Sequence, residues 1–170
     1  MNYKWIGAIL VVCSCTFGGF SMCTAFRREE RELQSLLGAL DYMICELQYR
    51  ATALPDLCRQ AAQDRGGLVG MFLNNLATEL DAQNAPDVQS CIAASAASAG
   101  ELPNRLRKAI CILGASLGRF DLDGQLQGFE TVRNFCRTEL EAMAAGRNTR
   151  LRSYQTLGLC AGAALAILFV

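Results

Sequence analysis

The chain ends in a pattern that changes character part-way along. Over 121–143, apolar side chains recur at steps of three or four, the period of one helix face; these are Leu122, Leu126, Phe129, Val132, Cys136, Leu140 and Met143. A basic cluster at 147–152 follows, and LGLCAGAALAILFV then continues to Val170 without a charge. The pattern predicts one long helix that begins in a bundle and ends in a membrane.

This final apolar stretch is short for a membrane span. From Thr156 to Val170 a helix rises about 22 Å, whereas the hydrocarbon core of a bilayer is ~30 Å thick. Including 153–155 lengthens the helix to about 27 Å, places Tyr154 at the interface and lets Arg152 extend to the headgroups. We therefore predict a C-terminal transmembrane helix over 154–170.

A second apolar run lies at the start of the chain. Residues 5–26 are uncharged, and as a helix they would extend about 33 Å, enough to span a bilayer. A cleaved signal peptide fits less well because 23–25 is a poor cleavage site, and neither Cys13 nor Cys23 follows the small residue that a lipoprotein signal needs. We predict an N-terminal transmembrane helix over 1–26.

The flanking charges set the orientation of these two spans. Arg27, Arg28 and Arg31 follow the first span, and Lys4 alone precedes it. The positive-inside rule therefore places the central domain in the cytoplasm and both termini outside. The basic cluster at 147–152 agrees with this two-pass arrangement.

Residues 27–153 have the pattern of one all-α domain. An apolar stripe predicts a helix that follows the first span almost at once: Leu33, Leu36, Leu37, Leu40, Met43, Ile44 and Leu47. Turn residues then separate further helices, which we expect at 54–63, 68–82, 87–99 and from 103 to about 117, before the C-terminal helix capped by Asp121. No stretch has the period of a strand. The sequence predicts a bundle of about six helices.

Individual residues make this prediction more specific. Thr52 suits the N-cap of the second helix and Pro55 its first turn. In the first helix, the run of charged residues at 27–32 is typical of a solvated helix start. In the third helix we expect Met71, Phe72, Leu76 and Leu80 on the buried side. The fourth is rich in small residues, which predicts a close-packed inner helix rather than disorder, and in the fifth we expect Arg105, Arg107 and Lys108 to be exposed.

Composition argues for a scaffold rather than an enzyme. The 170 residues include 16 basic and 16 acidic side chains, so no electrostatic footprint for nucleic acid is present. The chain has no histidine, and its nine cysteines form no CxxC pair; we interpret them as small buried hydrophobes in a reducing compartment, with a disulfide framework or metal site as the alternative. We find no catalytic motif and predict no catalytic, cofactor or metal site.

Small residues recur every four positions in both predicted spans. Such spacing lets helices pack closely in lipid, which favours an intramembrane hairpin or an oligomer. The positions are Ser14 and Gly18 in the first span, and Gly158, Gly162 and Ala166 in the second.

Several blocks resemble the stage III sporulation protein AB family of endospore-forming bacteria. They are Gly19-Phe20, LGALDYMICELQYRATALP at 37–55, LGASLGRFD at 113–121 followed by Gln125, and LGLCAG in the tail. Within 37–55 the family-like positions are Leu40, Glu46, Tyr49, Thr52, Leu54 and Pro55. Ala53 stands where a proline is expected, which affects the rigidity of that turn.

The resemblance implies a cytoplasmic helical domain similar to the platform protein of type II secretion and type IV pilus systems. Such a platform sits against a hexameric secretion ATPase, and the related stage III sporulation protein AA is the implied partner. The family belongs to the channel complex between mother cell and forespore. The resemblance therefore implies a non-enzymatic adaptor in the mother-cell membrane around the forespore, together with other channel proteins.

Two corners of the predicted bundle are candidates for partner binding. One joins the first and second helices and contains Glu46, Tyr49, Arg50 and Thr52; the other contains Arg119, Asp121 and Gln125. A role in turns and caps is the alternative for both, and Glu46 is suitably placed to pair with Arg50 four residues on. The alternative function is a structural or signalling membrane bundle without a motor partner.

Overall fold

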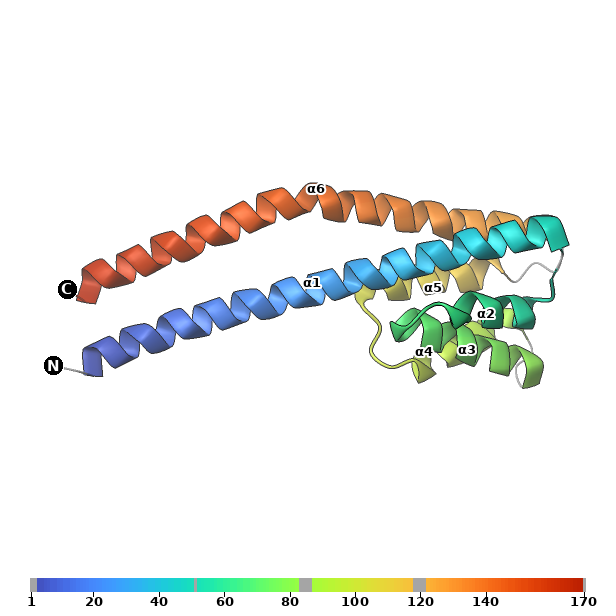
Figure 1. Cartoon of the computed structure of the whole chain (residues 1–170), viewed down its shortest axis with the longest axis horizontal. Helices are drawn as coiled ribbons and strands as arrows, with labels where there is room; N and C mark the ends of the chain where they lie inside the picture. The colour runs from blue at the N-terminus through green and yellow to red at the C-terminus, as the bar shows by residue number, and fades with distance from the viewer. Residues whose placement is uncertain (1–2, 51, 83–86, 118–121, 170) are drawn as a thin grey trace. The chain divides into compact units, whose positions relative to one another are not determined.

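A computed structural model describes the backbone of the chain except at residues 1–2, 51, 83–86, 118–121 and 170, and the side chains of 24–50, 52–82, 87–117 and 123–146. The described residues form six α-helices and no strand (Figure 1). The helices are α1 (Tyr3–Arg50), α2 (Leu54–Gln63), α3 (Gly67–Ala82), α4 (Val88–Ser98), α5 (Asn104–Ser116) and α6 (Leu122–Phe169). The predicted all-α, six-helix class is confirmed.

The chain divides into two compact units. One is the helical bundle, Glu29–Leu140, and the other combines Met1–Arg28 with Glu141–Val170. Because α1 and α6 are each continuous over 48 residues, both helices contribute to both units. The predicted domain boundaries at 26/27 and 153/154 stay predictions.

Among the residues whose side chains are described, no helix is long and apolar enough to cross a membrane. Apart from 24–26, the two predicted spans at 1–26 and 154–170 lie outside those residues. The same holds for the predicted packing positions, Ser14, Gly18, Gly158, Gly162 and Ala166.

The core of the bundle is built around one face of α1. Its predicted stripe is buried except at Leu37, which is half-buried. The other helices add large side chains that are almost fully buried, chiefly Leu57, Phe72, Leu73, Leu76, Leu106, Ile110, Leu113 and Phe129. Removing this apolar surface from water is the main stabilising contribution to the bundle.

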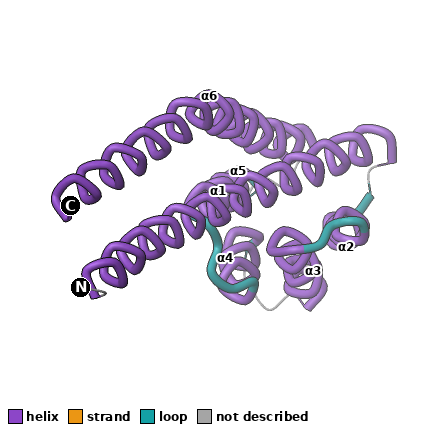
Figure 2. The backbone as a smooth tube through the Cα atoms, turned by 60° about the vertical axis from the view of Figure 1, so that its left-hand side comes forward, coloured by secondary structure: helices purple, strands orange, loops and turns teal. Residues whose placement is uncertain are grey.

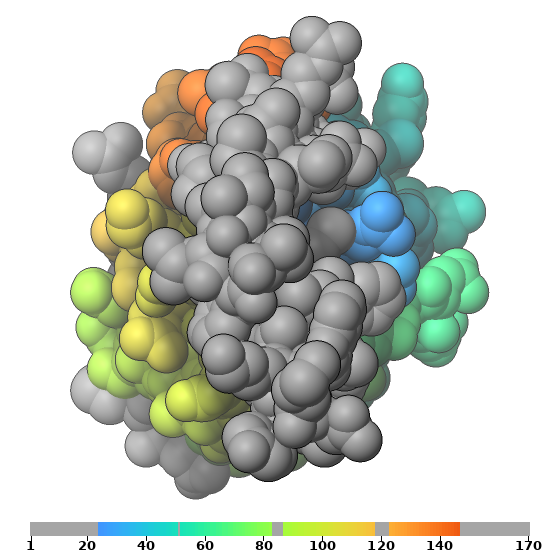
Figure 3. Space-filling model, turned by 90° about the vertical axis from the view of Figure 1, so that its left-hand side faces the viewer, coloured from blue at the N-terminus to red at the C-terminus, as the bar shows by residue number. Residues whose placement is uncertain are grey.

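The shorter helices pack in chain order. α2 contacts α3, α3 contacts α4 and α4 contacts α5. In two views, α2, α3 and α4 lie together on one side of the bundle segment of α1 (Figures 1 and 2). Side chains of α5 (yellow) and of the α2–α3 region (green) are visible at opposite sides of the bundle in Figure 3.

Local signals explain two helix starts. Pro55 occupies the first turn of α2 as predicted, where its missing N–H is not needed. At the start of α4, the Asp87 side chain accepts a hydrogen bond from the backbone N–H of Ser90 at 2.9 Å. Hydrogen bonding by the Ser90 side chain and backbone lowers the pKa of Asp87 below its ordinary value.

Three local predictions are wrong. The N-cap of α2 is Ala53, without a capping side chain, and Thr52 lies one residue before it. Met71 is 53% exposed, because α3 packs between α2 and α4 through a face centred on Phe72 and Leu73. Within α4, only one face is buried while several alanines face solvent, so it is not an inner helix.

Candidate partner-binding surface

The first predicted corner lies at the end of α1. Tyr49 is 82% exposed, the largest fraction for a big hydrophobic side chain in the described residues. Arg50 donates to Glu46 at 3.4 Å, as predicted from their spacing of four residues. The Glu46 side chain is only 16% exposed, whereas that of Arg50 is 75% exposed. The corner therefore exposes the ring of Tyr49 and the guanidinium of Arg50. The half-buried carboxylate of Glu46 pairs with that guanidinium.

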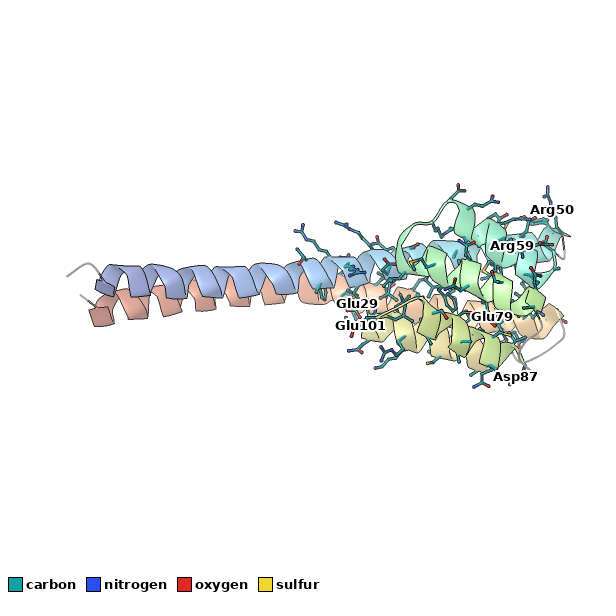
Figure 4. The ribbon with its side chains drawn as sticks, turned by 90° about the horizontal axis from the view of Figure 1, so that it is seen from below. Glu29, Arg50, Arg59, Glu79, Asp87 and Glu101 are labelled. Carbon is teal, nitrogen blue, oxygen red and sulfur yellow. The ribbon has the colours of Figure 1, made fainter. Side chains whose placement is uncertain are left out.

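Polar contacts join α1 to α2 and α2 to α3. The Tyr42 hydroxyl donates to Gln60 at 2.9 Å and joins α1 to α2. Arg59 then joins α2 to α3, because it pairs with Asp56 at 3.1 Å and with Asp81. The hydrogen bond and charge of Asp81 raise the pKa of Arg59 above its ordinary value. Arg50 and Arg59 lie toward the same end of the bundle (Figure 4).

Three ion pairs fix the direction of α6 against α1 within the bundle. Asp41 pairs with Arg133 at 3.7 Å. Arg105 in α5 binds Glu29 of α1 at 3.0 Å and Glu139 of α6 at 2.7 Å. Later positions in α1 thus correspond to earlier positions in α6, so the two helices run antiparallel within the bundle.

This register brings part of the second corner to the level of the first. Tyr49 lies eight residues after Asp41, and Gln125 lies eight residues before Arg133. Equal steps along antiparallel helices rise equally, about 12 Å here, so Tyr49 and Gln125 occupy the same end of the bundle. Gln125 is half-buried. Arg119 and Asp121 lie outside the described residues.

A polar cluster at the other end of the bundle is absent from the sequence prediction. Glu32 is only 9% exposed, and one of its oxygens accepts the backbone N–H groups of Leu68 at 3.1 Å and Val69 at 3.2 Å. Glu29 accepts from the backbone N–H of Arg105 at 3.1 Å as well as from its side chain. The predicted solvated start at 27–32 is therefore wrong for both glutamates.

The contacts continue along α1 at steps of three residues. Arg65, in the turn between α2 and α3, donates to the carbonyl of Ser35 at 3.1 Å and to that of Ala61 at 2.9 Å. Its guanidinium lies over Gly38, where an added Cβ would stand 3.1 Å from Nη2. We call Glu29, Glu32, Ser35 and Gly38 the α1 polar ladder.

The ladder was detectable in part from the sequence. Glu32 precedes Leu36 and Leu40 by four and eight residues, so it lies on the buried stripe, and a carboxylate there needs hydrogen-bond partners. Arg105 was expected to be exposed, but its side chain is only 30% exposed and binds two glutamates. The sequence around Arg105 does not predict these partners, because Glu29 lies 76 residues away and Glu139 lies 34 residues away.

Two of the bundle's thiols, those of Cys58 and Cys136, are buried and therefore poorly reactive. Burial raises the pKa of Cys58 to about 12 and that of Cys136 to about 12, so both are protonated at neutral pH. Cys45 and Cys111 are exposed, so the interpretation of the cysteines as buried hydrophobes is wrong for these two and correct for Cys58, Cys91 and Cys136. No group of three acidic, cysteine or histidine side chains that could hold a metal ion occurs within the described residues.

These features define the class of the protein as an all-α bundle of six helices whose first and last helices extend beyond the bundle unit. Comparison with known proteins then identifies its family. The model of the stage III sporulation protein AB family matches residues 4–170, and the chain belongs to that family. The predicted resemblance is thus confirmed.

A solved structure supports the fold. A chain described as stage III sporulation protein AB matches with a TM-score of 0.63 and 16% sequence identity, over 72% of this chain and 98% of that one. At this identity the likeness concerns the fold alone. A search of the curated proteins found no match.

Proposed function

We propose that this protein is a non-enzymatic membrane adaptor of stage III of sporulation that docks a secretion-type ATPase to the channel complex between mother cell and forespore. The observation that carries the proposal is the match to the stage III sporulation protein AB family over nearly the whole chain. The stage III sporulation protein AA is the proposed ATPase, and other channel proteins are proposed as further partners.

The surface at the end of α1 is the proposed docking site. Exposed aromatic and arginine side chains dominate binding energy in protein interfaces, and Tyr49 and Arg50 are exposed side by side here. The ion pair with Glu46 orients Arg50 before a partner arrives, which reduces the entropy lost on binding. We propose that Thr52, Gln125 and the neighbouring Arg119 and Asp121 belong to the same surface.

The proposed membrane arrangement follows from the two apolar ends of the sequence. We propose two transmembrane helices, at 1–26 and 154–170, in the mother-cell membrane around the forespore, with the bundle in the cytoplasm and both termini outside. We propose that the bundle resembles the cytoplasmic domain of type II secretion platform proteins in both fold and role. Contact with the motor would reach the membrane through α1 and α6, which each contain one proposed span.

Direct binding of the full-length protein to the ATPase tests the proposal. The chain is placed in lipid nanodiscs, and binding of the purified AA protein is followed by biolayer interferometry. We expect measurable affinity for the unaltered chain. Loss of an exposed aromatic anchor reduces affinity by about tenfold or more, so Tyr49→Ala should bind correspondingly more weakly, as should Arg50→Glu.

Lys108→Glu provides the matched control, since it also reverses an exposed charge but lies on α5. Lys108→Glu should bind the ATPase as the unaltered chain does. All three variants, Tyr49→Ala, Arg50→Glu and Lys108→Glu, should have the melting temperature of the unaltered chain. Absence of binding by the unaltered chain at high concentration and low salt would contradict direct docking. In that case, co-purification of other membrane proteins without an ATPase would support the structural or signalling alternative.

A further inference from the structure

Besides α2, whose N-cap is Ala53, two described helices of the bundle, α3 and α5, begin without a capping side chain of their own. α5 starts after Pro103, whose side chain has no hydrogen-bonding group, and α3 starts at Gly67. The first N–H groups of any helix lack partners within the helix and are normally satisfied by a nearby Ser, Thr, Asp or Asn. Here a carboxylate from another helix accepts the N–H groups of Leu68 and Val69 in α3, and a second carboxylate accepts that of Arg105 in α5.

Both carboxylates come from the same turn of α1. Glu32 accepts the N–H groups of Leu68 and Val69 in α3, and Glu29 accepts the N–H of Arg105 in α5. Negative charge is also favourable at these positions because the N-terminal end of a helix is partially positive. α1 therefore caps two helices that are far apart in the sequence.

The spacing of the two glutamates explains how one helix reaches both. Residues three apart on a helix differ by about 4.5 Å along its axis and by about 60° around it. Glu29 and Glu32 thus face different neighbours although both belong to one turn of α1. Leu33 and Leu36 beside them are fully buried, at 0% exposure, and hold that turn against the core.

These contacts are sensitive to the position of α1. A shift of one residue along the helix moves a side chain by about 1.5 Å and turns it by about 100°. The four hydrogen bonds made by Glu29 and Glu32 are 3.0–3.2 Å long. Hydrogen bonds are lost when the donor and acceptor move much farther apart than this. A displacement of this turn would break both caps at once.

We propose that Glu29 and Glu32 form a coupling device, through which the position of α1 sets the order of the first turns of α3 and α5 together. Loss of either cap loosens the shared turn of α1 and so weakens the other cap. The inference concerns the bundle alone and stands whether or not the protein docks an ATPase.

Hydrogen exchange in the full-length protein, held in nanodiscs, tests this coupling. Glu32→Ala removes the cap of α3, and the informative readout is the distant peptide that contains the amide of Arg105. Coupled sites typically influence each other by about fivefold or more, and we expect exchange there to rise by that factor. Glu29→Ala should have the reciprocal effect on the amides of Leu68 and Val69. Glu130→Ala, an exposed glutamate on α6, is the control and should leave both peptides unchanged.

A second substitution separates coupling from general loosening. Pro103 has φ −53° and ψ 149°, close to the conformation of ordinary capping residues, so Pro103→Asp gives α5 a cap of its own. In that background Glu32→Ala should still speed exchange in α3 but no longer in α5.

Two results would overturn the proposal. One is faster exchange only in the helix whose own cap is removed, and the other is an equal rise throughout the bundle, including α2. If Glu32→Ala is not recovered folded, Glu32→Gln, which keeps an acceptor oxygen but loses the charge, allows the same measurement with a smaller expected rise.

Discussion

At Gly67 the backbone and a buried carboxylate meet in a way that permits only glycine. Its φ is +78°, and a Cβ there would stand 2.5 Å from Oε1 of Glu32. Gly66, the preceding residue, has open space around the same position. Two adjacent glycines thus differ completely in what they tolerate.

We predict that Gly67→Ala destabilises the protein by about 1–3 kcal/mol, because the side chain adds backbone strain and displaces Glu32 from the N–H groups that it caps. Gly66→Ala should change stability by no more than about 0.5 kcal/mol. Thermal unfolding of the full chain in detergent, followed by circular dichroism, measures both. Equal effects of the two substitutions would show that Gly67 has no special conformational role.

The cysteines of the bundle should differ in reactivity. A thiol reacts as its thiolate, and burial raises the pKa of Cys58 and of Cys136 to about 12. At pH 8 we expect alkylation at the exposed Cys45 and Cys111, with Cys58 and Cys136 labelled only after unfolding. Peptide mass spectrometry locates the label, and early modification of Cys58 would contradict the buried assignment.

At the scale of elements, the helix boundaries were largely predictable because their signals are local. The bounds predicted for α2 agree with those observed, since Pro55 marks its first turn and a polar turn with two glycines follows it. The apolar stripe of α1 predicted its buried face. At Gly128, α6 approaches α5 closely, because an added Cβ would stand 3.0 Å from Cβ of Ser116.

The contacts between elements were not predictable in the same way. Capping by Glu29 and Glu32 depends on backbone groups 36 to 76 residues away, and a single sequence does not show which helix ends meet. The basic residues at the start of α5 were expected to be exposed. That expectation is correct for Arg107 and wrong for Arg105. At the partner surface, the pair of Glu46 and Arg50 followed from spacing, whereas the contribution of α2 through Tyr42 and Gln60 did not.

Arg105 should be the more important of the two arginines in the first turns of α5. Its removal leaves Glu29 and Glu139 without their shared cation. Because these groups remain partly exposed and screened, we expect Arg105→Ala to destabilise the bundle by about 1–2 kcal/mol. The exposed Arg107→Ala should cost no more than about 0.5 kcal/mol. Thermal unfolding at low and high salt provides the measurement, and the cost of Arg105→Ala should fall as salt rises.

At the scale of the whole molecule, the proposed two-pass arrangement is directly testable. In a variant whose native cysteines are replaced by alanine, a cysteine is placed either at Val170 or at the exposed Glu101 of the bundle. In right-side-out vesicles, we expect Val170→Cys to react with a membrane-impermeant reagent and Glu101→Cys to react only after permeabilisation. Reaction of Val170→Cys from the cytoplasmic side alone would exclude a C-terminal span.

The caps that α1 supplies also have a consequence for how the chain folds. α1 precedes α3 and α5 in the chain, so its glutamates are synthesised before the helices that they cap. The cap of α3 closes a loop of 36 residues and that of α5 a loop of 76 residues, and longer loops cost more entropy to close. Because α3 is synthesised before α5 and its cap closes the shorter loop, α3 should be completed on α1 first and α5 afterwards. The first helix then acts as the template on which the later ones are assembled.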